Sequence, residues 1–253
     1  MSQINRIDGG LIDQEKVLNF TFNGQILKGY EGDTLASALL ANNKHLIGRS
    51  FKYHRPRGIV TAGSEEPNAI MEIGNGAYKE PNTRATVTQL YNGLEANSQN
   101  HKGPLSFDFM AITDFLSPLL GAGFYYKTFM WPKGFWEKFY EPAIRKSAGL
   151  GTLSTEADPD TYDKGFRHCD ILIIGAGATG LSAALTAANS GAIIILADED
   201  FLMGGRLNSE TNEIDGMAGS EWAKKTVAKL GAMENVTLMS DTTVFGAYDH
   251  GIY

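Results

Sequence analysis

One glycine pattern between two apolar segments constrains the fold of this chain more than any other feature. The pattern is G-x-G-x-x-G, formed by Gly175, Gly177 and Gly180. Asp170–Ile174 before it predicts a short buried strand, Leu181–Ser190 after it predicts a helix, and Ala192–Ala197 predicts a second buried strand. A strand, a glycine turn, a helix and a second strand in this order indicate a Rossmann-type α/β fold.

Each glycine of the pattern has a physical role in holding a dinucleotide. Gly175 permits the tight strand-to-helix turn, Gly177 lets the backbone approach a pyrophosphate, and Gly180 lets helix and strand pack closely. The start of the helix presents free N–H groups and the positive end of its dipole to the phosphates. Because both strands and the helix accompany the glycines, we predict a dinucleotide-binding site; a glycine-rich turn in an unrelated α/β domain is the alternative.

Acidic residues follow the second strand. Asp198 lies eighteen residues after Gly180, where its carboxylate can accept hydrogen bonds from an adenosine ribose. Together with Glu199 and Asp200 it would repel a 2′-phosphate. The acids therefore favour NAD or FAD over NADP.

The segment after these acids has features of flavoproteins. A double glycine that ends at Gly205 is typical of two-dinucleotide flavoprotein folds rather than of simple dehydrogenases. Arg206 can reach a pyrophosphate or remain a solvated loop cation. A helix follows, then strands at Val236–Met239 and Thr242–Gly246, and Val244 can lie against an adenine or in the core.

The N-terminal part begins with a hairpin and a helix. Val17–Lys28 alternates apolar and polar residues around Asn23-Gly24, a pair that tolerates the positive φ of a tight turn. Asp33 or Thr34 can cap a helix in the segment that follows. Two short strands are then predicted near Ala69–Ile73 and Ala85–Gln89.

These elements divide the chain into α+β and α/β parts. Residues 1–105 predict a ferredoxin-like domain of the β-grasp type, and residues 168–253 predict a partial Rossmann domain of the two-dinucleotide flavoprotein type. Residues 106–167 connect them. The connector is rich in Phe, Tyr, Trp and Met, and Pro118, Pro132 and Pro142 divide it into short helices. It can pack on the domains or face a partner.

Composition excludes several classes of protein. A formal net charge of −7 argues against a general nucleic-acid binder. The single cysteine, Cys169, excludes a disulfide framework and a cysteine-held cluster, and it is expected to be a buried structural residue in a cytoplasmic protein. The five histidines do not have the spacing of metal ligands, so no metal site is predicted. The sequence has no run of about eighteen apolar residues, so no membrane span is expected.

One basic segment stands out in this acidic chain. Within "RSFKYHRPRG" (residues 49–58, hereafter the basic loop), five cationic or titratable side chains gather: Arg49, Lys52, His54, Arg55 and Arg57. Three roles are open for the basic loop: a structural or inter-subunit contact, a part in cofactor or substrate access, and nucleic-acid binding.

Three segments together resemble a known family. "GDTLASALLAN", "SFKYHRPRGIVTAGSEEPNA" and "DILIIGAGATGLSAALTAANSGAIIILADED" are similar to the N-terminal part of the alpha subunit of heterotetrameric sarcosine oxidases. The chain stops at "VFGAYDHGIY" without a final helix, so a fragment of a longer polypeptide is expected; an unusual natural C-terminus is the alternative.

The resemblance implies a multi-subunit flavoenzyme. In that family the alpha subunit binds NAD without using it for turnover, the beta subunit carries FAD, and FMN lies between the two. Gamma and delta subunits complete the assembly. It oxidises sarcosine to glycine with hydrogen peroxide and, with tetrahydrofolate, forms 5,10-methylenetetrahydrofolate. The β-grasp domain has no cluster cysteines, so no iron–sulfur cluster is expected.

The resemblance also implies which residues contact NAD. They are Thr179, Asp198, Glu199, Arg206 and Val244. Relatives often have a basic residue where this chain has Asp200, and a small hydroxyl residue where it has Arg206. No catalytic base or nucleophile is identifiable, so this segment alone should be inactive.

Two other functions are open. One is a subunit of an opine or amine dehydrogenase, similar to octopine dehydrogenase or hydrogen cyanide synthase. The other is a truncated product that only binds partners as a scaffold.

Overall fold

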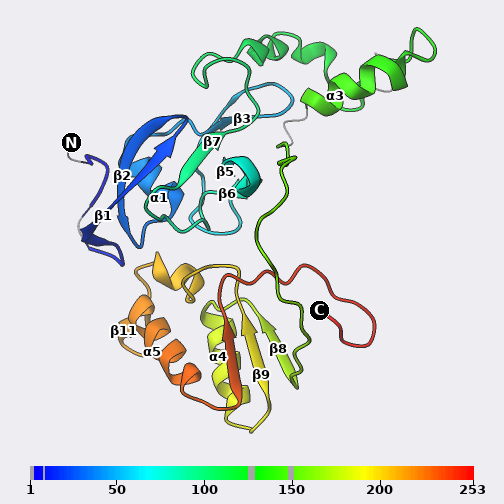
Figure 1. The fold of residues 1–253 in the computed structure, drawn as a ribbon. Coiled ribbons are helices and arrows are strands. Elements are labelled where there is room, and N and C mark those ends of the chain that lie inside the picture. Colours follow the sequence, from blue (N-terminus) through cyan, green and yellow to red (C-terminus); the bar gives the residue numbers. More distant parts are fainter. Residues whose placement is uncertain (1–2, 8, 125–128, 148–150) are drawn as a thin grey trace.

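The computed structural model describes residues 3–7, 9–124, 129–147 and 151–253 (Figure 1). It contains two sheet-based units, each with its own core of buried apolar side chains. Residues 151–170 join them without forming a helix or strand. No helix in these ranges has the length and apolar character needed to cross a membrane.

The first unit is a mixed five-stranded sheet with one helix. The sheet order is β2-β1-β7-β5-β6; β1 and β7 are parallel, and the other neighbours are antiparallel. Its elements are β1 (Asp13–Phe22), β2 (Gln25–Glu31), α1 (Leu35–Ala41), β5 (Ile70–Ile73), β6 (Glu80–Arg84) and β7 (Glu95–Ser98). Leu35 and Leu39 of α1 are fully buried in the core beside Phe20 of β1. This arrangement is the predicted α+β unit.

The local signals for the hairpin and the helix are confirmed. Asn23 and Gly24 have φ values of 49° and 76°, so they form the tight turn between β1 and β2. Thr34 is the N-cap of α1: its side chain accepts from the Ser37 N–H, and the Ser37 hydroxyl accepts from the Thr34 N–H. Asp33 is buried next to this cap.

The strand predicted near Ala85–Gln89 is wrong, because β6 ends before it. Ala85 is fully buried, and its N–H donates to the Ala69 carbonyl. The Ala85 carbonyl accepts from the Ala36 N–H of α1. The segment is therefore buried against the helix and forms no strand, although Gln89 makes an isolated antiparallel bridge with Thr34.

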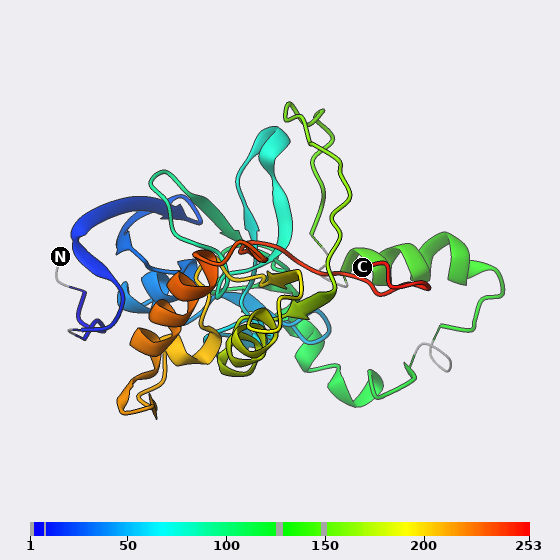
Figure 2. The same ribbon diagram turned by 90° about the horizontal axis from the view of Figure 1, so that it is seen from below.

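The connector contains short helical segments, as its prolines predicted. They are 3₁₀ helices at Phe109–Asp114 and Ser117–Leu119, a π-helical turn at Trp136–Tyr140, and α3 (Glu141–Ser147). Pro142 is the second residue of α3, which continues directly from the π-helical turn. Figures 1 and 2 both show the described part of this connector extending beyond the sheets. Phe115 and Trp131 are more than three-quarters exposed.

The second unit is a three-stranded parallel sheet with two main helices. The order is β12-β9-β8, and α4 packs against α5, β8 and β9. The elements are β8 (Ile171–Ile174), α4 (Ala178–Ala188), β9 (Ile194–Ala197), β10 (Glu213–Ile214), β11 (Met217–Ala218), α5 (Gly219–Gly231) and β12 (Val236–Met239). β9 is central and buried throughout, as predicted.

Three details of this unit differ from prediction. The first strand, β8, is at the sheet edge, so Ile171 and Ile174 are 40% and 58% exposed rather than buried. Cys169 just before it is partly exposed for the same reason. Thr242–Gly246 is not a strand; the Thr242 N–H donates to the Asp198 carbonyl, which directs the segment across the strand ends.

Candidate dinucleotide-binding site

A cavity of about 510 Å³ lies at the carboxyl ends of β8 and β9. Ile174, Gly175, Ala197 and Asp198 contribute these strand ends. The opposite wall is residues 60–65 of the first unit, so both units form the cavity. The carboxyl edge of a parallel sheet is where open α/β folds bind their ligands.

The glycine loop has the geometry that its pattern requires. Gly175 has a φ of +93°, and its N–H donates to the Ala197 carbonyl over 2.8 Å. A Cβ on Gly180 would lie 1.8 Å from the Gly175 carbonyl oxygen, so only glycine permits this approach of helix and strand. A Cβ on Gly205 would lie 3.1 Å from the Gly177 Cα, which places the second double glycine against the first loop.

The start of α4 is open to an anion. Gly177 is the N-cap residue, and no side chain caps the first N–H groups of the helix. These N–H groups and the helix dipole together favour a phosphate. The residues present therefore fit the pyrophosphate of a dinucleotide.

Asp198 holds the end of the second strand to the glycine loop. One oxygen of its carboxylate accepts a short hydrogen bond from the Ala176 N–H, and the other accepts from the Asp200 N–H over 2.8 Å. The side chain is 8% exposed and lines the cavity. A carboxylate has about four lone-pair sites, so Asp198 can accept further hydrogen bonds from a ribose hydroxyl.

One side of the cavity is strongly acidic. Burial, followed by the charges of Asp198 and Glu199 and then of Glu65 and Asp241, raises the pKa of Asp200 to about 6. Such a surface disfavours a 2′-phosphate and accepts hydrogen bonds from ribose hydroxyls.

The structure brings together most of the predicted site residues. Those that line the cavity are Gly175, Asp198, Glu199, Gly205, Arg206 and Val244. Gly177, Thr179 and Gly180 do not line it and belong to the loop and helix start behind it. Val244 is partly buried and outside the core, which favours the adenine-side alternative.

Arg206 is at present a surface cation. Its Nε donates to Glu210 over 2.7 Å, one helical turn later, and 79% of its side chain is exposed. The Arg206 guanidinium thereby lowers the pKa of Glu210, as does the Asn212 amide. Its position on the cavity rim leaves it able to reach a phosphate after releasing Glu210.

Residues 60–65 were not predicted as part of this site. A buried carboxylate, Glu66, fixes their conformation: it accepts from the N–H groups of Val60 and Thr61 over 2.8 and 2.7 Å, and from Asn68 over 2.7 Å. Burial acts to raise the pKa of Glu66, but these hydrogen bonds and one from the Ala69 N–H have the larger effect, so the pKa is lowered overall. "TAGSEEP" indicates a loop, but no local signal shows what the loop contacts.

Two family models match parts of the chain. Residues 15–101 match a 2Fe-2S iron-sulfur cluster binding domain, and residues 170–211 match an FAD binding domain. The first match covers the mixed sheet and the basic loop, and the second covers β8, α4, β9 and the acids that line the cavity.

Whole-chain comparison gives one consistent result. Sarcosine oxidase subunit alpha of Rhizobium meliloti (strain 1021) is 59% identical over 96% of this chain. The subunit of the same name from Corynebacterium sp. (strain U-96) is 34% identical over 95% of it. The chain is homologous to the N-terminal part of sarcosine oxidase subunit alpha. It spans 25% of the first of these relatives and 20% of the second.

A solved structure agrees with the fold. L-proline dehydrogenase from P. horikoshii superposes with a TM-score of 0.53 at 19% identity, covering 94% of this chain and 36% of that one. At this identity the likeness concerns the fold alone. The comparisons confirm the predicted resemblance to sarcosine oxidase subunit alpha. They also confirm that the chain combines a ferredoxin-like domain with a dinucleotide-binding domain.

The cofactor prediction requires correction. The expectation of no iron–sulfur cluster is wrong for a domain that matches a 2Fe-2S cluster binding family. That expectation depended only on the absence of cysteine ligands, whereas the family model matches the domain as a whole. Residues 15–101 contain no cysteine, so a cluster in this domain would need ligands other than thiolates from its own segment. The match to the second unit names FAD, where the residues alone left NAD or FAD open and the family resemblance implied NAD.

Proposed function

We propose that this chain is the N-terminal, dinucleotide-binding part of the alpha subunit of a sarcosine oxidase, and that the cavity beside Asp198 binds the adenosine end of FAD. The observation that carries the proposal is the cavity itself. It places Gly175 of the glycine loop beside a group of acids at the carboxyl edge of a parallel sheet, and the uncapped start of α4 follows directly after that loop.

Each part of an adenine dinucleotide has a matching surface. The helix start at Gly177 and the close contact with Gly205 suit the pyrophosphate. Asp198 and Glu199 suit the ribose hydroxyls, and Val244 supplies an apolar surface for the adenine. The bound cofactor supplies redox chemistry, whereas these residues bind and orient it.

The proposal extends to the assembly and its reaction. Beta, gamma and delta subunits would complete a complex that converts sarcosine to glycine, with hydrogen peroxide and, with tetrahydrofolate, 5,10-methylenetetrahydrofolate as products. The support is the name and similarity of the relatives. Within this chain we place a ferredoxin-like domain at residues 1–105, a connector at 106–167 and the first part of a Rossmann domain at 168–253.

The test uses the complete natural protein that contains this chain, purified with its partners. Bound cofactors are released by denaturation, identified by mass spectrometry, and then titrated back. We compare Glu199→Ala with Glu234→Ala, because both glutamates are exposed but only Glu199 lines the cavity. We expect FAD affinity to fall roughly tenfold in the first variant, since a charged hydrogen-bond acceptor is lost, and to stay unchanged in the second.

Two results would contradict parts of the proposal. Release of NAD without FAD, with NAD affinity sensitive to Glu199, would show the adenosine site to be correct and its cofactor wrong. Equal FAD affinity in both variants would place the cofactor elsewhere in the protein.

A further inference from the structure

The basic loop folds around one buried histidine. β3 (Gly48–Arg49) and β4 (Pro56–Arg57) pair as a small antiparallel ladder, and His54 lies between them with a φ of 53°. Its N–H donates to the Ser50 carbonyl over 3.0 Å, and its own carbonyl accepts from the Arg49 guanidinium over 3.1 Å. The side chain is only 4% exposed.

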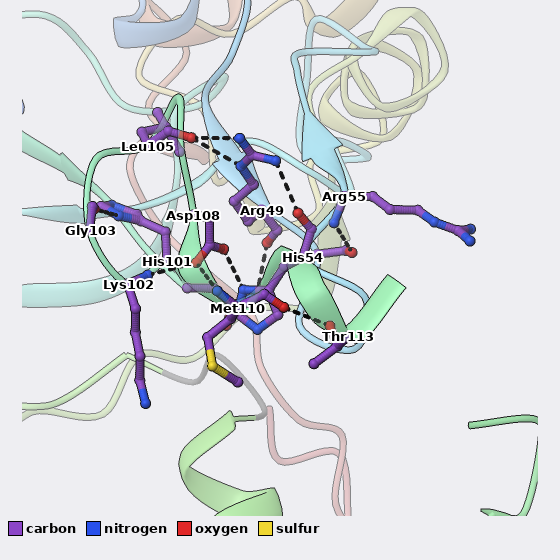
Figure 3. A network of polar contacts seen from close by, with 12 residues as sticks. Arg49, His54, Arg55, His101, Lys102, Gly103, Leu105, Asp108, Met110 and Thr113 are labelled. Atoms are coloured by element: carbon purple, nitrogen blue, oxygen red, sulfur yellow. Dashed lines mark hydrogen bonds and ion pairs between the residues drawn. The ribbon is translucent and has the colours of Figure 1, made fainter. Parts of the chain in front are cut away.

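One ring nitrogen of His54 is held by a carboxylate. The distance from Nδ1 to Oδ2 of Asp108 is 2.5 Å, and Asp108 also accepts from the N–H groups of Lys102 and Met110 (Figure 3). Burial raises the pKa of Asp108, but the two N–H groups and His54 lower it more, to a net decrease. Asp108 is therefore an anion that keeps a proton on Nδ1.

The other ring nitrogen has no partner. Nε2 of His54 is the one buried side-chain nitrogen or oxygen in the described ranges that makes no hydrogen bond. An unpaired buried polar atom costs about 1–3 kcal/mol, so its presence calls for a compensating role such as binding of a water molecule or an ion. His54 lines a cavity of about 240 Å³ together with Lys102 and Met110.

The charges around this cavity favour an anion. Lys102 and Lys146 line it, and neither ammonium has an ion-pair partner among the described residues. The lining glutamate, Glu72, is neutralised by Lys79 at 2.7 Å. His101 lines the cavity too, but its ring contacts the Ser98 hydroxyl and the Gly103 carbonyl.

A metal ion fits this cavity less well. A histidine held by a carboxylate is common among metal ligands, but a site needs further ligands. The described part of the chain has no group of three His, Cys, Asp or Glu side chains suited to a metal.

We propose that this second cavity binds an oxyanion, the phosphate or carboxylate group of a small ligand, between Nε2–H of His54 and the ammonium of Lys102. Binding requires the imidazolium form of His54, in which Nε2–H donates to the ligand and Nδ1–H donates to Asp108. Charge-assisted hydrogen bonds of this kind are stronger than neutral ones. The basic loop is thus a ligand-binding element, distinct from the dinucleotide cavity.

The test measures binding of inorganic phosphate to the complete protein through the broadening of its ³¹P resonance. The variants are His54→Gln and Lys102→Met. The matched controls are His45→Gln and Lys164→Met, whose side chains are exposed and outside the cavity. We expect saturable broadening in the wild type and both controls, roughly tenfold weaker binding in Lys102→Met, and none from this cavity in His54→Gln.

Competition identifies the source of the oxyanion. If acetate displaces phosphate with an inhibition constant below the dissociation constant of phosphate, the natural ligand carries a carboxylate. If the inhibition constant of acetate is the higher of the two, the natural ligand carries a phosphate. Sodium chloride at the same ionic strength should not displace the bound phosphate.

Two outcomes would overturn the proposal. One is equal phosphate affinity in Lys102→Met and Lys164→Met, which stays decisive even if His54→Gln fails to fold. The other is displacement of phosphate by chloride at concentrations as low as those at which phosphate itself binds.

Discussion

Buried carboxylates in this chain differ in what their oxygens contact. Glu66 accepts four backbone N–H groups and one hydroxyl, and its pKa lies below its ordinary value. Asp200 is partly buried beside other acids, so burial first and then these charges raise its pKa to about 6. The first carboxylate stabilises a loop in its charged form, whereas the second is destabilising when charged.

The raised pKa of Asp200 predicts a pH dependence of stability. The folded chain holds the proton up to about pH 6, whereas the unfolded chain releases it near 3.8. The contribution of Asp200 is therefore fully present below about pH 4 and is lost as pH rises through 6. Asp200→Asn cannot ionise, so it should be more stable than wild type at pH 7, by about 1 kcal/mol after allowance for solvent screening.

Denaturant unfolding at pH 4 and pH 7 checks this prediction. Asp163→Asn, in the exposed connector, is the control and should leave stability unchanged at both pH values. A stability gain of the same size at pH 4 would mean that packing, not ionisation, explains the effect of Asp200→Asn.

At the scale of elements, sequence reasoning succeeded where the cause was local. The Asn23-Gly24 turn, the Thr34 cap and the glycine loop each depend on backbone conformations that a few adjacent residues determine. It failed where neighbours determined the outcome: Ala85 is buried by a helix, and β8 is exposed because it is an edge strand. Apolar composition alone does not distinguish these situations.

The glycine loop predicts different outcomes for its members. Ala at position 180 would place a Cβ 1.8 Å from the Gly175 carbonyl, so Gly180→Ala should cost about 2 kcal/mol of stability and abolish dinucleotide binding. Nothing lies within 4 Å of a Cβ on Gly177. Gly177→Ala should therefore keep its stability but lose binding, because the added methyl group meets the pyrophosphate.

Thermal unfolding and cofactor titration together test this contrast. Gly165→Ala is the control, since its Cβ would also meet no atom within 4 Å and Gly165 does not line the dinucleotide cavity. Unchanged binding in Gly177→Ala would show that the pyrophosphate does not approach this loop.

At the scale of the whole molecule, the candidate site combines a part that the sequence revealed with a part that it did not. The glycine loop and Asp198 lie within one βαβ segment, so their proximity follows from chain connectivity. Residues 60–65 reach the same cavity from the other unit, more than one hundred positions earlier. A contact over that separation depends on how two cores pack, which no residue spacing encodes.

This shared wall predicts that dinucleotide binding affects both units. Addition of FAD to cofactor-free protein should slow hydrogen exchange in residues 60–65 as well as in the glycine loop, because the ligand would lie between them. The hairpin of β1 and β2 does not line the cavity and serves as the internal control. Mass spectrometry of peptides after timed exchange measures all three segments at once.

Protection confined to the glycine loop would show that residues 60–65 only border the site. Slower exchange in both segments would establish them as a part of it, and would explain why a ferredoxin-like unit and a dinucleotide-binding unit occur in one chain.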